Sequence, residues 1–122
     1  MRVADTSALY ALFNEGDRHH ARASAAMESP EPIVVPREIL TETIDLIGYR
    51  KGWPHARKAL ASLLALPHVR PAEPVNLDAV VAVYEAGGGD LSLADAVVVQ
   101  TCRVLAAEPL TFDADIVAAL KA

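Results

Sequence analysis

The chain has 122 residues, of which 52% are hydrophobic and 22% are charged, and its formal net charge is −5. This length fits one compact unit, so we expect residues 1–122 to form a single domain with a hydrophobic core. No apolar run approaches the roughly 18 residues that a membrane-spanning helix needs, and the first residues lack the apolar stretch of a secretion signal. Cys102 is the only cysteine, which excludes an internal disulfide and a zinc site built from several thiolates. We therefore expect a cytoplasmic protein without a membrane partner.

The net negative charge argues against a protein that coats nucleic acid with a basic surface. This argument weakens if the acids bind cations, because two divalent ions would add +4 and take the charge from −5 to −1. The basic residues are unevenly distributed, and Arg50, Lys51, Arg57 and Lys58 lie within nine residues of one another. This basic run is a candidate RNA-binding surface, although such runs are more often the solvated start of a helix.

In the first half of the chain, short apolar runs alternate with helical spacing. Val3-Ala4 ends a short strand, and the helix that follows is stopped by the polar residues 14–17. A second helix is expected over 20–27. The β-branched run 33–35 indicates a buried parallel strand. Apolar residues at positions 40, 44 and 47 predict a third helix, which Gly48 or Gly52 ends.

The second half continues this alternation. In chain order we expect a helix from Pro54 to Pro67, a brief strand at Val69, a helix over 77–86, a helix capped by Ser92 and running to Ala106, a strand over 109–111, and a terminal helix capped by Asp113. Three glycines at 87–89 lack the Gly-Lys-Ser/Thr of a phosphate loop and indicate a plain joint. Short buried strands alternating with helices predict an α/β fold of three layers, in which helices flank a short central parallel sheet.

Acidic residues follow the predicted strands. Asp5 comes directly after the first strand, Glu42 lies two turns into the helix after the second, and Asp95 lies in the first turn of the helix that follows the glycines. Asp113 and Asp115 follow the last strand. Ligands of parallel sheets lie beyond the carboxyl ends of the strands, so four separate stretches would bring carboxylates to one edge.

Each of these acids also has a structural interpretation. Asp5 and Asp113 can cap helices, Asp95 can form a capping box with Ser92, and Glu42 occupies a position typical of a helix surface. Two details favour function. Glu42 has no cation three or four residues away, and Asp95 has mostly apolar neighbours at these spacings, so its charge needs a partner.

Converging carboxylates imply a bound cation. Two carboxylates within about 4 Å repel each other by roughly 4 kcal/mol at an effective dielectric constant near 20. The absence of a Cys/His set favours Mg²⁺ or Mn²⁺ over zinc, and His19 and His20 are most simply solvent-facing. Such an ion suits phosphodiester cleavage, since it orients the phosphate, lowers the pKa of an attacking water and offsets charge on the leaving oxygen.

Four segments resemble the sequence blocks of PIN domains, specifically of VapC-type toxins. They are VADTSAL at 3–9, Val35-Pro36 followed by Glu42, LSLADA at 91–96, and LTFDAD at 110–115. The segments occur in the order of the family and span nearly the whole chain, so together they are specific. Two departures are Pro36, where the family commonly has a small polar residue, and the absence of a further short strand after the last segment.

The resemblance implies an acidic quartet at the catalytic site. Its members would be Asp5, Glu42, Asp95 and Asp113, with Asp5, Asp95 and Asp113 as metal ligands. Glu42 would complete the metal shell or orient the attacking water. The resemblance also implies an additional acid at the site, Asp115. It implies hydroxyl groups that support the metal ligands by hydrogen bonding, those of Thr6, Ser7 and Thr111.

The resemblance further implies a Mg²⁺- or Mn²⁺-dependent endoribonuclease, the toxin component of a VapBC-type toxin–antitoxin pair. RNA would be its substrate, a VapB-type antitoxin its partner, and a homodimer its usual state. The alternatives are an RNA-processing nuclease without a toxin role and a non-catalytic PIN-like binding module, which the intact set of four acids opposes. A phospho-acceptor signalling domain is disfavoured, because Asp5 has no paired acid beside it and no lysine follows the last strand.

Overall fold

The computed structural model describes residues 1–122, which form four strands and seven helices. In chain order these are β1 (Arg2–Ala4), α1 (Thr6–Leu12), α2 (His20–Glu28), β2 (Ile33–Val35), α3 (Arg37–Lys51), α4 (Trp53–Leu64), β3 (Val69–Pro71), α5 (Leu77–Ala86), α6 (Leu93–Leu105), β4 (Glu108–Leu110) and α7 (Ala114–Lys121). Each strand and helix expected from the sequence is present, with shifts at some boundaries. None of the helices has the length and apolar character needed to span a membrane.

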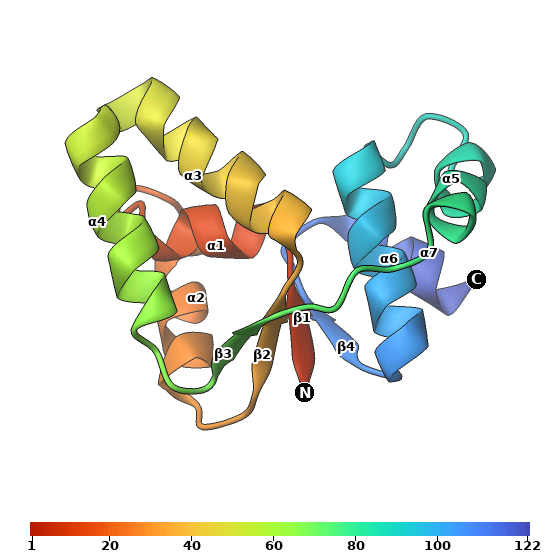
Figure 1. Ribbon diagram of the computed structural model, residues 1–122, viewed down its shortest axis with the longest axis horizontal. Coiled ribbons are helices and arrows are strands. Elements are labelled where there is room, and N and C mark those ends of the chain that lie inside the picture. The colour runs from red at the N-terminus through yellow and green to blue at the C-terminus, as the bar shows by residue number, and fades with distance from the viewer.

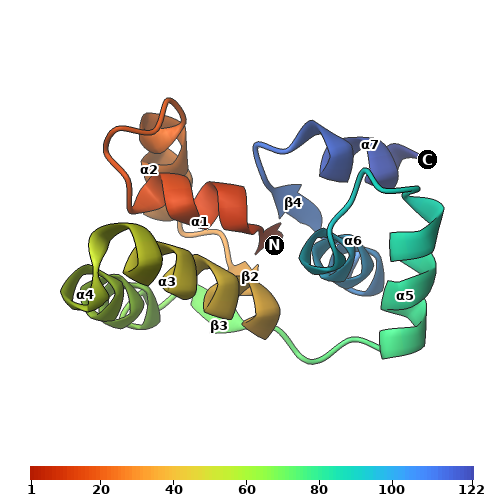
Figure 2. The ribbon, with the colours of Figure 1, turned by 90° about the horizontal axis from the view of Figure 1, so that it is seen from above.

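The four strands form one parallel sheet in the order β3-β2-β1-β4. The first strand is central, with Val3 opposite Val34 of β2 on one side and opposite Pro109 of β4 on the other. Figure 1 shows the sheet between two groups of helices, α1–α4 on one face and α5–α7 on the other. The same two groups stay on opposite sides in the view from above (Figure 2). The predicted three-layer α/β fold is therefore confirmed.

An apolar core extends over both faces of the sheet. Val3 in β1 is fully buried, as are Leu9 of α1 and Ile116 of α7. The helix α6 contributes four consecutive buried residues, Ala96–Val99, because it packs against β1 and β4 and is also covered by α5 and α7. Burial of an aliphatic side chain of this size stabilises a protein by about 1.5–3 kcal/mol. This packing holds the ends of β1 and β4, and the acids that follow them, in fixed positions.

The helices α3 and α4 are joined at Gly52. Of the two glycines that the sequence offered as the end of this helix, Gly48 lies inside α3 and Gly52 ends it. Gly52 has a φ of 94°, which residues with a side chain rarely adopt. A glycine is therefore needed where the chain turns back into α4.

Cys102 on α6 provides a test of this packing. The side chain is 2% exposed, and burial raises the pKa of its thiol to about 11. Only about one thiol in a thousand would then be the reactive thiolate at pH 8. We predict that 5,5′-dithiobis(2-nitrobenzoate) labels native Cys102 only as fast as the protein opens, and labels it promptly in denaturing urea. Prompt labelling without urea would show that α6 is loosely packed.

Candidate active site

Asp5 lies at the carboxyl end of β1 and is 2% exposed. Its backbone N–H donates to the carbonyl of Leu110 in β4, at 3.2 Å. Its carboxylate accepts hydrogen bonds from the Ala8 N–H at 2.9 Å, from the Ser7 hydroxyl at 2.8 and 2.9 Å, and from the Thr111 hydroxyl at 2.5 Å. A buried carboxylate is tolerated only with such partners, and these contacts fix its position.

The two hydroxyls that donate to Asp5 also bind the backbone that follows β4. The Ser7 Oγ accepts a hydrogen bond from the Phe112 N–H at 3.0 Å, and the Thr111 Oγ1 accepts one from the Asp113 N–H at 2.9 Å. Each hydroxyl thus gives its hydrogen to Asp5 and a lone pair to the β4–α7 loop. This network gives the predicted supporting role of Ser7 and Thr111 a structural basis.

The electrostatics of the site act most strongly on Asp5. Burial raises its pKa above the usual value, and the hydrogen bonds from Thr111, Ala8 and Ser7 oppose this rise. The negative charge of Asp113 adds to the rise in pKa, which means that the two carboxylates repel each other. A cation bound beside them would favour the charged form of Asp5.

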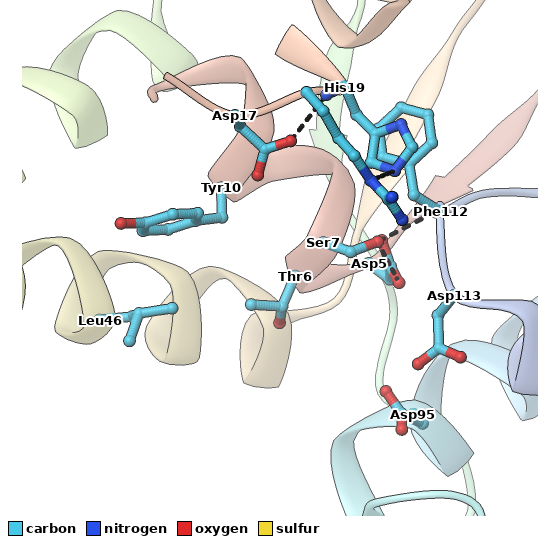
Figure 3. Close-up of a pocket in the computed structure, with 11 residues that line it drawn as sticks. Asp5, Thr6, Ser7, Tyr10, Asp17, His19, Leu46, Asp95, Phe112 and Asp113 are labelled. Carbon is cyan, nitrogen blue, oxygen red and sulfur yellow. Dashed lines mark hydrogen bonds between the residues drawn. The ribbon is translucent and has the colours of Figure 1, made fainter. Parts of the chain in front are cut away.

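Asp95 and Asp113 each cap a helix and also face the pocket. The Asp95 Oδ2 accepts the Ser92 N–H at 2.9 Å, and the Ser92 hydroxyl accepts the Asp95 N–H at 3.0 Å, so the predicted capping box of α6 is present. The Asp113 Oδ1 accepts the Asp115 N–H at 2.8 Å at the start of α7. The other oxygens, Asp95 Oδ1 and Asp113 Oδ2, accept no hydrogen bond from the protein. The two carboxyl groups point toward one another in Figure 3, below Asp5.

These three aspartates line one pocket of about 490 Å³, together with Thr6, Ser7, Tyr10, Asp17, Arg18, His19, Leu46 and Phe112. The pocket lies beyond the carboxyl ends of β1 and β4, as the placement rule for parallel sheets predicts. Asp5, Asp95 and Asp113 come from three stretches that are distant in the sequence. The structure brings them together.

Glu42 approaches this pocket from α3 through a contact with Thr6. The Thr6 Oγ1 donates a hydrogen bond to the Glu42 Oε1, and Thr6 itself lines the pocket of the three aspartates. The Glu42 side chain is exposed and lines a neighbouring hollow with Glu38 and Glu73. Glu42 is therefore at the margin of the site and is joined to it through Thr6.

Asp115 does not point into the site. It is exposed and lines a different pocket, which Arg103, Asp90 and residues of α5 and α7 share. Its backbone N–H is the group that Asp113 caps, so its contact with the site is made by the backbone. The structure thus separates Asp115 from the other predicted acids.

The basic run lies on α3 and α4, and none of its members lines the pocket of the three aspartates. Most of them contact other side chains: Arg50 lies over the Tyr10 ring at 5.1 Å, Arg57 lies over the Trp53 ring at 5.1 Å, and the Lys51 Nζ donates to the Asn14 Oδ1 at 3.3 Å. Lys58 is exposed. Only Arg50 is connected to the pocket, because Tyr10 lines it.

The donor atoms of the pocket suit a hard cation. The carboxylates of the three aspartates and the hydroxyls of Thr6 and Ser7 offer oxygen, which Mg²⁺ and Mn²⁺ prefer. No group of three or more His, Cys, Asp or Glu side chains is already arranged to hold a metal ion. The capping bonds of Asp95 and Asp113 each leave one oxygen free, so these residues can supply ligands without releasing their helices.

The sequence analysis missed the aromatic and basic side of the pocket. His19 was expected to face solvent, but its ring is partly buried and stacks on Phe112 with a centroid distance of 4.3 Å and an interplanar angle of 10°. His20 was also expected to face solvent, but it is partly buried and its Nδ1 lies 2.8 Å from the Ala11 carbonyl. One feature of the sequence could have indicated this side of the pocket: Phe112 stands between Thr111 and Asp113, directly after the last strand, and so has to lie at the edge of the sheet.

A comparison with protein families places the chain. The model of the PIN-domain family matches residues 2–121. The chain belongs to this family, and the resemblance inferred from the four sequence segments is confirmed.

Among solved structures, the chain is similar to VapC20 of Mycobacterium tuberculosis, which is described as a toxin that cleaves the sarcin-ricin loop. The two sequences are 29% identical, the TM-score is 0.81, and the match covers 98% of this chain and 95% of that one. A comparison with curated proteins finds no match.

Replacement of Thr111 tests the network around Asp5. Thr111→Val keeps the shape of the side chain but removes the donor to Asp5 and the acceptor for the Asp113 N–H. We expect the free energy of unfolding, measured in urea, to fall by about 1–3 kcal/mol. The control Thr41→Val, at an exposed position of α3, is expected to change it by less than about 0.5 kcal/mol. Equal effects of the two variants would contradict the network.

Proposed function

We propose that this PIN-domain protein is an endoribonuclease that depends on Mg²⁺ or Mn²⁺. The observation that carries the proposal is the meeting of Asp5, Asp95 and Asp113 in one pocket at the carboxyl edge of the sheet. The similarity to VapC20, which is described as a toxin that cleaves the sarcin-ricin loop, supports a nuclease reaction. Each aspartate is held by its own backbone or hydroxyl contacts, so the acids are in place before substrate arrives.

The proposed mechanism assigns distinct tasks to these side chains. Asp5, fixed by Ser7 and Thr111, and the free oxygens of Asp95 and Asp113 would hold the cation. A bound Mg²⁺ would polarise the scissile phosphate, lower the pKa of the attacking water and offset charge on the leaving oxygen. Glu42, positioned by Thr6 at the margin of the pocket, would complete the metal shell or orient the attacking water.

We also propose that the protein is the toxin of a VapBC-type pair. A VapB-type antitoxin would then be its partner, and a homodimer its state in solution. The similarity to a VapC toxin over 98% of the chain supports this assignment over a role in general RNA processing. Large exposed hydrophobic side chains, including Trp53 at 69% and Tyr49 at 90%, leave apolar surface for such partners.

Cleavage of RNA by the purified protein tests the reaction. With a fluorogenic RNA and an oligonucleotide that carries the sarcin-ricin loop, we expect cleavage in Mg²⁺ or Mn²⁺ and none in EDTA. Asp5→Asn and Asp113→Asn should each lower the rate by at least about 100-fold, because they remove metal ligands.

Asp115→Asn is the matched control for these variants, because it removes an acid of the same segment that lies outside the pocket. It is expected to keep a rate close to that of the wild type. Thermal melting gives a second readout: Mg²⁺ should raise the Tm of the wild type and of Asp115→Asn, but not that of Asp113→Asn. Absence of cleavage in every metal would favour the non-catalytic binding module instead.

Expression in bacteria tests the toxin role separately from the reaction. We expect induction of the wild-type chain to arrest growth and Asp113→Asn to relieve the arrest at equal protein levels. Co-expression of a small antitoxin-like reading frame from the same operon should restore growth. Robust RNA cleavage in vitro without growth arrest would favour the RNA-processing nuclease.

A further inference from the structure

A second group of side chains borders the acidic pocket, on the side of the α1–α2 loop. Arg18 and His19 precede α2, and Arg22 lies in its first turn. The ring of His19 stacks on Phe112 from the β4–α7 loop, and the guanidinium of Arg22 lies 4.9 Å from the centroid of the Phe112 ring. Figure 3 shows His19 and Phe112 stacked above Asp5 and Asp113. We call Arg18, His19, Arg22 and Phe112 the basic rim.

The side chains of the basic rim have more hydrogen-bond donors than acceptors. The Arg18 Nε donates to the His19 Nε2 at 3.2 Å, and the Arg22 Nη1 lies 3.4 Å from the His19 Nδ1. Guanidinium groups have only donors, whereas a neutral imidazole has one donor and one acceptor nitrogen. In a neutral imidazole, one of the two contacts therefore places a guanidinium N–H against the N–H of the ring, so that two donors face each other. In a protonated imidazole, both contacts would be of this kind. Because these contacts are to the two different nitrogens of the ring, His19 lies between the guanidinium groups. An oxyanion bound beside them would supply the missing acceptors.

The two arginines also lack a carboxylate partner. The single salt bridge of the structure joins the N-terminal amino group to Glu31, so neither Arg18 nor Arg22 is paired with an acid. Asp17 is adjacent in the sequence, but its Oδ1 accepts the His19 backbone N–H at 2.8 Å. Both arginines are exposed, and their charges are free to meet an anion from solution.

The position of the basic rim identifies the kind of anion. Arg18 is the only Lys or Arg that lines the pocket of Asp5, Asp95 and Asp113. When one phosphate of an RNA strand lies at the acids, the neighbouring phosphate lies just beside the acidic pocket. Further carboxylates at that place would repel this phosphate. The basic rim offers cations at that place, and the planar fork of donors on a guanidinium group matches the geometry of phosphate.

We propose that Arg18 and Arg22 bind a backbone phosphate of the RNA strand next to the phosphodiester that is cut, with the stacked His19 and Phe112 as their platform. This inference rests on the proposed ribonuclease function. It makes the two arginines substrate-binding residues that set which phosphate reaches the acids. The alternative is that they only hold the α1–α2 loop against the β4–α7 loop.

Binding of a short single-stranded RNA separates these roles. Arg18→Gln, Arg22→Gln and the double variant would be made in full-length Asp113→Asn protein, so that the RNA stays intact. We expect each single variant to raise the Kd, measured by fluorescence anisotropy, by about 10-fold, and the double variant to raise it further. Loss of one phosphate contact should also flatten the slope of log K against log salt by about 0.7. Circular dichroism melts confirm folding, and Arg18→Lys should retain part of the affinity if the charge matters.

The matched control is Arg70→Gln, which removes an exposed arginine from the edge strand β3, outside the pocket. It should leave the Kd and the salt slope unchanged. Equal losses for Arg70→Gln and Arg18→Gln, an unchanged Kd in the double variant, or no RNA binding by the parent protein would each overturn the inference. If the glutamine variants do not fold, the lysine variants Arg18→Lys and Arg22→Lys replace them. Partial loss of affinity in the folded lysine variants supports the inference, and full affinity in both counts against phosphate recognition by the guanidinium groups.

Cleavage assays distinguish failure of this inference from failure of the nuclease proposal. In active protein the double variant should raise KM with little change in kcat, because the contact is made equally to the substrate and to the transition state. Cleavage by the wild type together with an unchanged KM in the double variant would contradict the proposed phosphate site but not the proposed nuclease activity. Weakened RNA binding in the rim variants, without any cleavage by the wild type, would contradict the nuclease activity but support a phosphate-binding role of the arginines.

Discussion

The buried carboxylate of Asp5 is the charge on which the arrangement of the pocket depends. Burial of an isolated carboxylate costs several kcal/mol, and here two hydroxyls and one backbone N–H offset that cost. Because the Ser7 and Thr111 hydroxyls bind the backbone after β4 as well, the network that satisfies Asp5 also positions the loop that carries Asp113. The same contacts therefore close the sheet edge and assemble half of the acidic site.

Capping and metal binding are compatible in this fold, although the sequence presents them as alternatives. Asp5, Asp95 and Asp113 are each the N-cap or the capping-box acid of a helix. A carboxylate has two oxygens, and a cap can be made with one of them. The caps of α6 and α7 leave the second oxygen of Asp95 and of Asp113 free at the pocket. A helix start is thus a fixed place from which a ligand oxygen could be presented, so a capping role for these residues does not argue against a role in the site.

The sequence predicted the strands and the helices because these depend on local patterns. That Asp5, Asp95 and Asp113 lie at one edge of the sheet followed from the rule that ligand-binding groups gather beyond the carboxyl ends of parallel strands. The β-branched run 33–35, the glycine at 52 and the Ser92–Asp95 spacing each specify a conformation through nearby residues. The basic rim could not be predicted in this way, because His19 and Phe112 meet only when β1 and β4 are neighbours in the sheet. Asp115 lies outside the pocket for the converse reason, since spacing in the sequence does not determine the side of a helix that faces a distant element.

Charge balance constrains how this acidic protein would bind the proposed RNA substrate in an acidic pocket. The net charge of −5 and the four aspartates that line the pocket would repel RNA, so binding requires cations between the two. A metal ion would supply them where the phosphodiester is cut, and Arg18 and Arg22 would supply them beside it. The two sources act at different places, so the metal would govern the reaction and the arginines the register of the strand. Arg18 precedes α2 and Arg22 lies in its first turn, where the His19 ring and the Arg22 guanidinium contact Phe112, next to Asp113. This contact would couple the register of the strand to the acids of the pocket.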